Sequence, residues 1–268
     1  MSGIIFGCQT YSWQMSFDKF SGKIPHIADT IKAAGFAGME AEICMLGETY
    51  FSNPTLLKET LLEKGLKFPV LTLPGHWIHA KETEEEYALA QRAIDFLKEF
   101  PGSKLMLAHY PLDKREDVKE RQQNHISCLL EITKRANDKG IVTSFHPNSP
   151  EGSLFRTPED YEILFDRIWN TPLGYTPDAG HIAHSNMDPL EVFKKYHEKI
   201  NHVHYKDMAE NGDWKSMGEG CIDFKGITDY LRSISYDGWI MVEEESKEAV
   251  ADPDKVTLAN GRYMLQEL

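Results

Sequence analysis

The sequence contains few cysteines and no paired cysteine motif. Its four cysteines are scattered over 268 residues without a Cys-x-x-Cys pair, and they are Cys8, Cys44, Cys128 and Cys221. This spacing argues against the disulfide framework of a small secreted domain. We expect reduced, buried thiols of a cytosolic protein.

Positive charge and long apolar runs are also scarce. Lysine and arginine number 29 against 42 acidic residues, which gives a formal net charge of −13. Nucleic-acid binders normally carry a basic surface, so this balance argues against DNA or RNA as a partner. No apolar run approaches the roughly 20 residues of a membrane span. The segment Met1–Phe6 lacks the basic region and apolar core of a signal peptide. We therefore expect a cytoplasmic protein without a membrane partner.

The glycine-rich turn of dinucleotide-binding folds is missing as well. The first apolar run leads into Gln9-Thr10-Tyr11-Ser12-Trp13 and not into G-x-G-x-x-G, which disfavours the open doubly wound sheet. The chain instead repeats a rhythm of short apolar run, polar turn and amphipathic segment. The apolar runs predict strands at residues 4–10, 38–42, 66–73, 104–109, 141–146, 173–178, 200–206 and 238–243.

Capping signals and helical periodicity predict a helix after each strand. Thr83 opens a capping box, and Pro158 follows Thr157 at a predicted first helical position. Eight strand–helix units in a chain of this length indicate an α/β protein that forms a closed (β/α)8 TIM barrel, a single domain over residues 1–268.

Polar residues gather where the predicted strands end. In a (β/α)8 barrel these ends converge on one mouth. Histidines stand at or just beyond four consecutive strand ends, and carboxylates stand at three. The residues concerned are Gln9, Tyr11, Glu40, Glu42, His76, Trp77, His109, His146, Asn148, Asp178, His181, His202, His204, Lys206, Glu243, Glu244 and Glu245.

The seventh predicted strand is the most unusual of these segments. Period-2 alternation places His202, His204 and Lys206 on one face. Two imidazoles and an ammonium fill a core poorly, but they suit a polar pocket that holds a metal. A surface strand with incidental histidines is the alternative.

A divalent cation fits the predicted strand ends. Asp178, His204 and Glu243 come from strands six, seven and eight, which are neighbours in a barrel, and His146 from strand five completes a mixed nitrogen and oxygen shell. Such a shell suits Mn²⁺, Zn²⁺ or Fe²⁺ better than Ca²⁺. We expect Mn²⁺ first, with Co²⁺ and Mg²⁺ as further alternatives. Glu243 is preferred to Glu244 because it directly follows the apolar run 239–242.

Four stretches resemble the xylose isomerase-like TIM-barrel superfamily, which includes sugar isomerases and epimerases and inosose dehydratases. They are Pro177-Asp178-Ala179-Gly180-His181, His202-Val203-His204-Tyr205-Lys206-Asp207, Gly218-Glu219-Gly220 and Gly238-Trp239-Ile240-Met241-Val242-Glu243. The resemblance implies that Asp178, His204 and Glu243 bind the metal. It also implies that His181 contacts the substrate or a water on the metal.

Strand five departs from the epimerase pattern of this superfamily. Epimerases place a glutamate there, whereas this chain has His146, which resembles the inosose-dehydratase branch. Two-base epimerisation loses one candidate base by this change, while elimination needs one base and one acid. We therefore favour a lyase that acts on a keto-sugar or inosose-like polyol ketone over a sugar or sugar-phosphate isomerase or epimerase.

Several residues have expected roles in that reaction. The base is His146, if it is not a ligand, or Glu40 or Glu42. His181 is the expected acid, and Lys206 is expected to steady a developing oxyanion. Lys206 has the alternative role of pairing with Asp207 or Glu243.

The expected substrate contacts come from other strand ends and loops. Trp13, His76 and Trp77 offer rings that can stack on a sugar, with core packing as the alternative for the tryptophans. Arg156 offers a phosphate or carboxylate contact, with a plain surface arginine as the alternative. The remaining expected substrate contacts are Glu40, His109, Asn148 and His181.

Three other classes of function stay open to different degrees. A nuclease is disfavoured by the net charge of −13. A subunit that cleaves 3-keto-glycosides, including C-glycosides, is compatible with the same α-proton chemistry and would have a small partner subunit. A non-enzymatic sugar-binding barrel would need no metal. Analogy with the superfamily further predicts a homo-oligomer.

Overall fold

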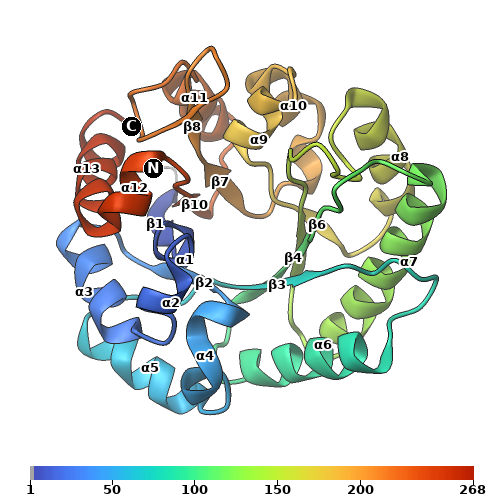
Figure 1. The fold of residues 1–268 in the computed structure, drawn as a ribbon, viewed down its shortest axis with the longest axis horizontal. Coiled ribbons are helices and arrows are strands. Elements are labelled where there is room, and N and C mark those ends of the chain that lie inside the picture. The colour runs from blue at the N-terminus through green and yellow to red at the C-terminus, as the bar shows by residue number, and fades with distance from the viewer. Residues whose placement is uncertain (1–2) are drawn as a thin grey trace.

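The computed structural model describes residues 3–268. Of the predicted domain 1–268, Met1 and Ser2 lie outside the described residues, and so does that part of the segment searched for a signal peptide. Eight parallel strands form one sheet inside a ring of helices (Figure 1). The strands of this sheet are β1 (Ile5–Gln9), β2 (Met39–Glu42), β3 (Val70–Gly75), β4 (Lys104–His109), β5 (Thr143–His146), β6 (Gly174–Tyr175), β7 (Val203–Tyr205) and β10 (Trp239–Val242).

The sheet closes into a barrel. Its hydrogen-bonded order is β6-β5-β4-β3-β2-β1-β10-β7, and the two end strands are joined by parallel bridges at Tyr175–Ile200 and Asp178–His204. The amide of His204 donates to the carbonyl of Pro177 at 2.9 Å. The predicted single-domain (β/α)8 barrel is therefore confirmed.

An outer ring of helices covers the sheet (Figure 1). It consists of α3 (Ile24–Ala33), α5 (Pro54–Glu63), α6 (Glu84–Leu97), α7 (Val118–Asn137), α8 (Pro158–Ile168), α10 (Pro189–Lys195), α11 (Phe224–Ser233) and α13 (Pro253–Gln266). The predicted starts of α6 and α8 are confirmed by full capping boxes at Thr83 and Thr157. The last helix, α13, packs against α3 and β1, so the C-terminal helix lies beside the first strand.

Shorter elements occupy the connections between strands and outer helices. They are α1 (Tyr11–Gln14), α2 (Phe17–Phe20), α4 (Ile43–Phe51), α9 (Ala179–His184), the 3₁₀ helix η1 (His197–Lys199), α12 (Lys247–Ala251) and the antiparallel pair β8 (Asp207–Met208) and β9 (Trp214–Lys215). Most of them follow the carboxyl end of a barrel strand and so surround the mouth.

Two strands differ from their predicted bounds because of proline. The third strand begins at Val70 and not at Leu66, since Pro69 has no amide hydrogen to donate to the ladder. The sixth strand is only two residues long, since Pro177 interrupts the run that was expected to reach Asp178. The expectation of buried thiols holds only in part, because Cys221 is exposed.

Apolar side chains fill the layer between sheet and helices. The middle of the barrel differs, because Glu40, His202 and His204 lie there and are fully buried. Residues 3–268 include no helix with both the length and the apolar character that a bilayer crossing requires.

Candidate active site

A cavity of about 280 Å³ opens at the carboxyl end of the barrel strands. Polar and aromatic side chains dominate its wall. The lining residues are Gln9, Tyr11, Gln14, Glu42, Thr72, Pro74, Met106, Ala108, His109, Tyr110, Pro111, His146, Asn148, Ser149, Pro150, His181, His184, Trp214, Glu243 and Glu245. The structure thus brings residues from several barrel strands, and from the loops that follow them, to one space, as expected for the mouth of this fold.

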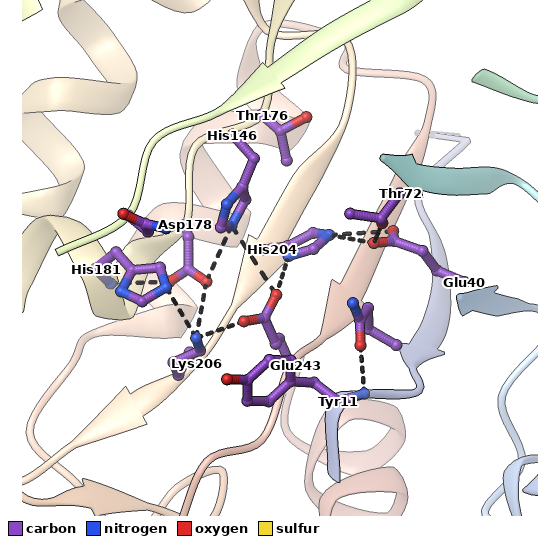
Figure 2. Close-up of polar contacts among 12 residues, drawn as sticks. Tyr11, Glu40, Thr72, His146, Thr176, Asp178, His181, His204, Lys206 and Glu243 are labelled. Atoms are coloured by element: carbon purple, nitrogen blue, oxygen red, sulfur yellow. Dashed lines mark hydrogen bonds and ion pairs between the residues drawn. The ribbon is translucent and has the colours of Figure 1, made fainter. Parts of the chain in front are cut away.

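Four donor atoms converge beside this cavity. One ligand atom each from His146, Asp178, His204 and Glu243 lies within 4.8 Å of the other three, and all four side chains are buried. Figure 2 shows them pointing toward one another from neighbouring strands. His204 Nδ1 lies 2.8 Å from Glu243 Oε2, and His146 Nε2 lies 3.5 Å from Asp178 Oδ2. We call these four residues the open cluster.

Backbone pairing explains why these side chains meet. An isolated parallel bridge joins Asp178, which lies just beyond β6, to His204 of β7, and Met241 of β10 is paired with His204. Asp178 is also the N-cap of α9, where its Oδ1 accepts the amide hydrogen of His181 at 2.9 Å. One carboxylate oxygen therefore fixes the side chain, and the other, Oδ2, is left to face the cluster.

The open cluster has the properties of a cation site. His146 Nε2 and Asp178 Oδ2 are buried and have no hydrogen-bond partner within residues 3–268. Buried polar atoms are normally paired, and these two lie 3.5 Å apart without a hydrogen bond, so a cation between them would satisfy both. Two imidazole nitrogens and two carboxylate oxygens are a donor set that fits Mn²⁺, Zn²⁺ or Fe²⁺.

Lys206 is buried and holds the carboxylates around the open cluster. Its Nζ donates to Glu243 Oε1 at 2.5 Å, to His181 Nε2 at 3.0 Å and to Glu245 Oε1. An ammonium has three hydrogens, so none is free for a substrate, and Lys206 is not among the cavity-lining residues. Its predicted catalytic role as an oxyanion stabiliser stays a prediction, whereas these contacts give Lys206 a role in holding the carboxylates.

The alternative partners expected for Lys206 are now distinguished. Glu243 is one of its partners, but Asp207 is not. The Asp207 carboxylate accepts amide hydrogens from Gly218 and Gly220, each at 2.9 Å. Asp207 therefore organises the loop that carries the Gly-x-Gly motif.

The charges of this region stabilise one another. Burial alone would raise the pKa of Asp178 and Glu243, but the Lys206 ammonium and the neighbouring histidines together outweigh burial and lower both pKa values. Burial alone would lower the pKa of Lys206, and the surrounding carboxylates raise it well above its usual range. Two ionised carboxylates and one ammonium therefore coexist in the barrel interior near neutral pH.

His181 lines the cavity, as expected of a residue that contacts substrate. Its Nδ1 lies 2.8 Å from the Ser149 hydroxyl, and its Nε2 accepts from Lys206. Burial and the charge of Lys206 lower the pKa of His181 to about 3. The ring is therefore neutral with both nitrogens engaged, which does not suit the predicted role of general acid.

A second group of polar residues lies deeper in the barrel, and we call it the enclosed cluster. Glu40 Oε2 lies 2.7 Å from His202 Nε2, His204 Nε2 lies 3.0 Å from Glu40 Oε1, and Thr72 donates to Glu40 Oε1 at 3.1 Å. Glu40 is fully buried and is not among the cavity-lining residues. Its predicted role as a substrate contact or base stays a prediction, and the contacts seen here are with His202, His204 and Thr72.

The pKa values within the enclosed cluster indicate one ionised carboxylate. Burial would raise the pKa of Glu40, but the two histidines outweigh it and lower it to about 2. Burial lowers the pKa of His202 to about 4, although Glu40 opposes this. For His204, the carboxylates of Glu40 and Glu243 overcome burial and raise the pKa to about 10.

Two carboxylates outside the four-residue open cluster do reach the cavity. Glu42, two residues beyond Glu40 on the same strand face, accepts from Cys44 Sγ and from the Tyr110 hydroxyl, each at 3.2 Å. Glu245 lies on the wall beside Lys206. Burial raises the pKa of both carboxyl groups.

Three other predicted substrate contacts lie away from the cavity wall. Trp13 is fully buried, and its Nε1 donates to Asp254 Oδ1 at 2.7 Å. His76 is exposed with its ring 5.2 Å from that of Tyr110. Arg156 is half-buried in the loop before α8. Core packing also accounts for Trp77, whose ring lies 5.0 Å from His125. The contacts of Trp13, His76 and Arg156 with substrate therefore stay predictions, and none of the three is among the cavity-lining residues.

His109 and Asn148 do line the cavity, and their contact with substrate stays a prediction. The Asn148 side chain donates to the His109 carbonyl at 3.0 Å, and His109 Nε2 accepts from the Leu154 amide at 3.2 Å. His109 therefore fits two interpretations at once. Its ring is hydrogen-bonded within the protein, and it also forms part of the cavity wall.

One side of the cavity is an aromatic wall that was not predicted from the sequence. Trp214, on the β8–β9 hairpin, lines the cavity with its ring 5.0 Å from that of His184 and 5.5 Å from that of His181. The signal was Asn211-Gly212, a dipeptide typical of hairpin turns. It lies between Met208 and Trp214, which pair across the hairpin.

Comparisons with known proteins agree with this architecture. A family model described as xylose isomerase-like TIM barrel matches residues 28–267. Inosose dehydratase of Lacticaseibacillus casei is 25% identical, with 88% of this chain and 87% of that protein covered. Inosose dehydratase 2 of Bacillus cereus is 28% identical, with 87% and 86% covered. The solved structure of IOLI protein with a binding zinc atom shares the fold at a TM-score of 0.77 and 14% identity, covering 98% of this chain and 97% of that one. Since the family model spans most of the sequence, this chain belongs to the xylose isomerase-like TIM barrel family.

Proposed function

We propose that this protein is a divalent-cation-dependent lyase acting on a neutral keto-polyol such as an inosose. The observation that carries the proposal is the open cluster, in which His146, Asp178, His204 and Glu243 aim four donor atoms at one point beside the cavity. The two relatives named inosose dehydratase support elimination as the reaction type.

The four residues of the open cluster would hold the cation. When bound, Mn²⁺ would supply a Lewis acid for the carbonyl group of the substrate. Zn²⁺, Fe²⁺, Co²⁺ and Mg²⁺ are alternatives, and the zinc in the related solved structure supports Zn²⁺ as the first of them. His146 acts as a ligand here and not as the base, because its Nε2 faces the Asp178 carboxylate.

Glu42 is the base in this proposal. It is the strand-two carboxylate that reaches the cavity, and burial raises its pKa toward the range of an effective base. Glu42 takes the proton α to the carbonyl, and the electron pair of that C–H bond forms the new C=C bond. The C–O bond at the β carbon breaks, and the hydroxyl group leaves as water after taking a proton from Glu245, which lines the same cavity.

The charge of the cavity wall selects the substrate class. Within residues 3–268 the wall includes the carboxylates Glu42, Glu243 and Glu245, and it includes no lysine or arginine. Lys206 pairs with Glu243 and Glu245 from behind the wall. Glu42 is therefore the carboxylate that would repel a phosphate or carboxylate group without a compensating side-chain cation. The proposed substrate is therefore uncharged, and the tryptophan and tyrosine of the wall, Trp214 and Tyr11, offer faces for its C–H groups.

One observation keeps an epimerase as the second candidate. Because Glu42 and Glu245 both line the cavity, the chain has two carboxylates that could serve as bases on two sides of a substrate. In that case Glu245 would return a proton to the α carbon, and no C–O bond would break.

The test uses protein freed of metal by chelation and reloaded with Mn²⁺. A panel of inososes and unphosphorylated keto-sugars is incubated in D₂O, and deuterium at the α carbon and ultraviolet absorbance of a conjugated enone are followed. We expect both signals for at least one inosose, only after reloading, and a kcat/KM at least about tenfold lower for phosphorylated analogues. Deuterium with an epimer and no enone selects the epimerase. Fully loaded protein that exchanges no α proton contradicts both.

The finer expectations for the cellular context stay predictions. They are a cytoplasmic location, a homo-oligomer and a small partner subunit that would accompany 3-keto-glycoside cleavage. Size-exclusion chromatography with light scattering of the purified chain tests the second of these.

A further inference from the structure

His204 makes two different contacts through the two nitrogens of one ring. Its Nδ1 lies 2.8 Å from Glu243 Oε2 in the open cluster, and its Nε2 lies 3.0 Å from Glu40 Oε1 in the enclosed cluster. Figure 2 shows the ring lying between the two carboxylates. A ring nitrogen that binds a metal carries no hydrogen, so His204 would lose one hydrogen on binding a cation and keep the other.

We propose that Glu40 is a positioning residue that keeps the hydrogen of His204 on Nε2 and aims Nδ1 at the cation. The inference rests on the cation site of the proposed function. Ligating histidines commonly donate their second ring N–H to a carboxylate, which fixes both tautomer and ring orientation. Glu40 does not touch the substrate, because it is fully buried and outside the cavity wall.

The surroundings of Glu40 show that its carboxylate is itself held in place. His202 Nε2 lies 2.7 Å from Oε2, and the Thr72 hydroxyl donates to Oε1 at 3.1 Å. A buried charge is costly unless it is hydrogen-bonded on several sides. Hydrophobic residues would fill the middle of the barrel at lower cost, so a role toward His204 accounts for retaining an ion there.

The experiment measures Mn²⁺ affinity directly, by competition with a fluorescent chelator, alongside thermal melting of the metal-free protein. We expect Glu40→Gln to weaken Mn²⁺ binding by about 10- to 100-fold. Glu40→Asp keeps the charge but retracts it by one methylene, so we expect an intermediate loss. The matched control is Glu42→Gln, on the same face of the same strand, which should keep the wild-type affinity within about threefold.

The outcomes separate this inference from the proposed function. If Glu40→Gln melts cooperatively and binds Mn²⁺ as tightly as the wild type, the positioning role is wrong while the cation site stands. If Glu40→Gln does not fold, Glu40→Asp decides, and an unchanged affinity of that variant overturns the role. A wild-type protein that binds no Mn²⁺ or Zn²⁺ overturns the cation site and this inference together.

Discussion

The open and enclosed clusters use the same residue types in the same barrel and share His204, yet their atoms are satisfied differently. In the enclosed cluster, Glu40 receives hydrogen bonds on both oxygens from within the protein. In the open cluster, buried atoms of His146 and Asp178 have no partner within residues 3–268. His202 Nδ1 of the enclosed cluster is unpaired as well among these residues, so the two clusters differ in their carboxylates, and chemistry is expected beside the unpaired oxygen of Asp178.

Spacing along the strands produces this difference. Glu40 and Glu42 point to the same side of β2, and residues two apart on a strand are separated by roughly 6–7 Å. Glu42 therefore reaches the cavity while Glu40 stays in the layer beneath it. In the seventh strand segment, His202 contacts Glu40. His204 contacts two carboxylates, those of Glu40 and Glu243.

The largest effect is expected from breaking the open cluster. Asp178→Asn removes a ligand charge but keeps the shape of the side chain, so we expect at least about a 1000-fold loss of kcat/KM and loss of stoichiometric Mn²⁺. Metal analysis and turnover on the substrate found in the panel measure this. Full metal content with full turnover would remove Asp178 from the ligand set.

The second-largest effect is expected for Glu42, and it distinguishes the proposed base from the metal ligands. Glu42→Gln should lower kcat by about 10²- to 10⁴-fold, since the cavity loses its proposed base. It should leave Mn²⁺ affinity nearly unchanged, because Glu42 contacts Cys44 and Tyr110 and no ligand. Equal losses of kcat and metal affinity would place Glu42 among the ligands instead.

His125 is a buried histidine of a third kind, because its neighbours are aromatic rings and not the carboxylates found in the open and enclosed clusters. Burial lowers its pKa to about 3, whereas an unfolded histidine has a pKa of about 6.5. Between these two pKa values His125 is protonated in the unfolded chain but not in the native state. The free energy of unfolding therefore decreases as the pH falls through 6.5. Between pH 7 and pH 5 this costs about 2 kcal/mol.

Urea unfolding at several pH values measures that contribution. His125→Phe and His125→Leu cannot titrate, so the free energy of unfolding of each should fall by about 2 kcal/mol less than that of the wild type between pH 7 and pH 5. Two apolar variants are compared because each changes packing differently but removes the same proton site. A wild-type slope in both variants would contradict the neutral, buried state of His125.

The smallest expected effect concerns the aromatic wall of the cavity. Trp214→Ala removes a ring face that lines the cavity, and we expect KM to rise by about tenfold, in line with the energy of one aromatic contact. Mn²⁺ affinity should not change. Trp169→Ala at the partly exposed C-cap of α8 is the control, and it should leave KM unchanged. Equal KM values for Trp214→Ala and the wild type would show that the substrate does not contact Trp214 of the hairpin.

Local sequence signals determined much of this protein. Strand alternation correctly put His202, His204 and Lys206 on one buried face, and the capping boxes at Thr83 and Thr157 begin their helices as predicted. The expectation that strand ends converge at the mouth of the barrel also agrees with the structure, since the ligand atoms of His146, Asp178, His204 and Glu243 lie within 4.8 Å of one another. These features depend on backbone period and strand order, which are written in residues that are near one another in sequence.

Only the tertiary structure decided which of several equivalent residues reaches the cavity. Alternation places Glu40 and Glu42 on the same face, and only the depth of the barrel separates the enclosed carboxylate from the one that lines the cavity. The choice of Trp214 over Trp13 depends on the hairpin that folds over the mouth and on Asp254, which pairs with the Trp13 indole from 241 residues away. The depth of a side chain in the barrel and its contacts with residues distant in sequence leave no periodic pattern in the sequence. They arise only when distant strands and loops pack together.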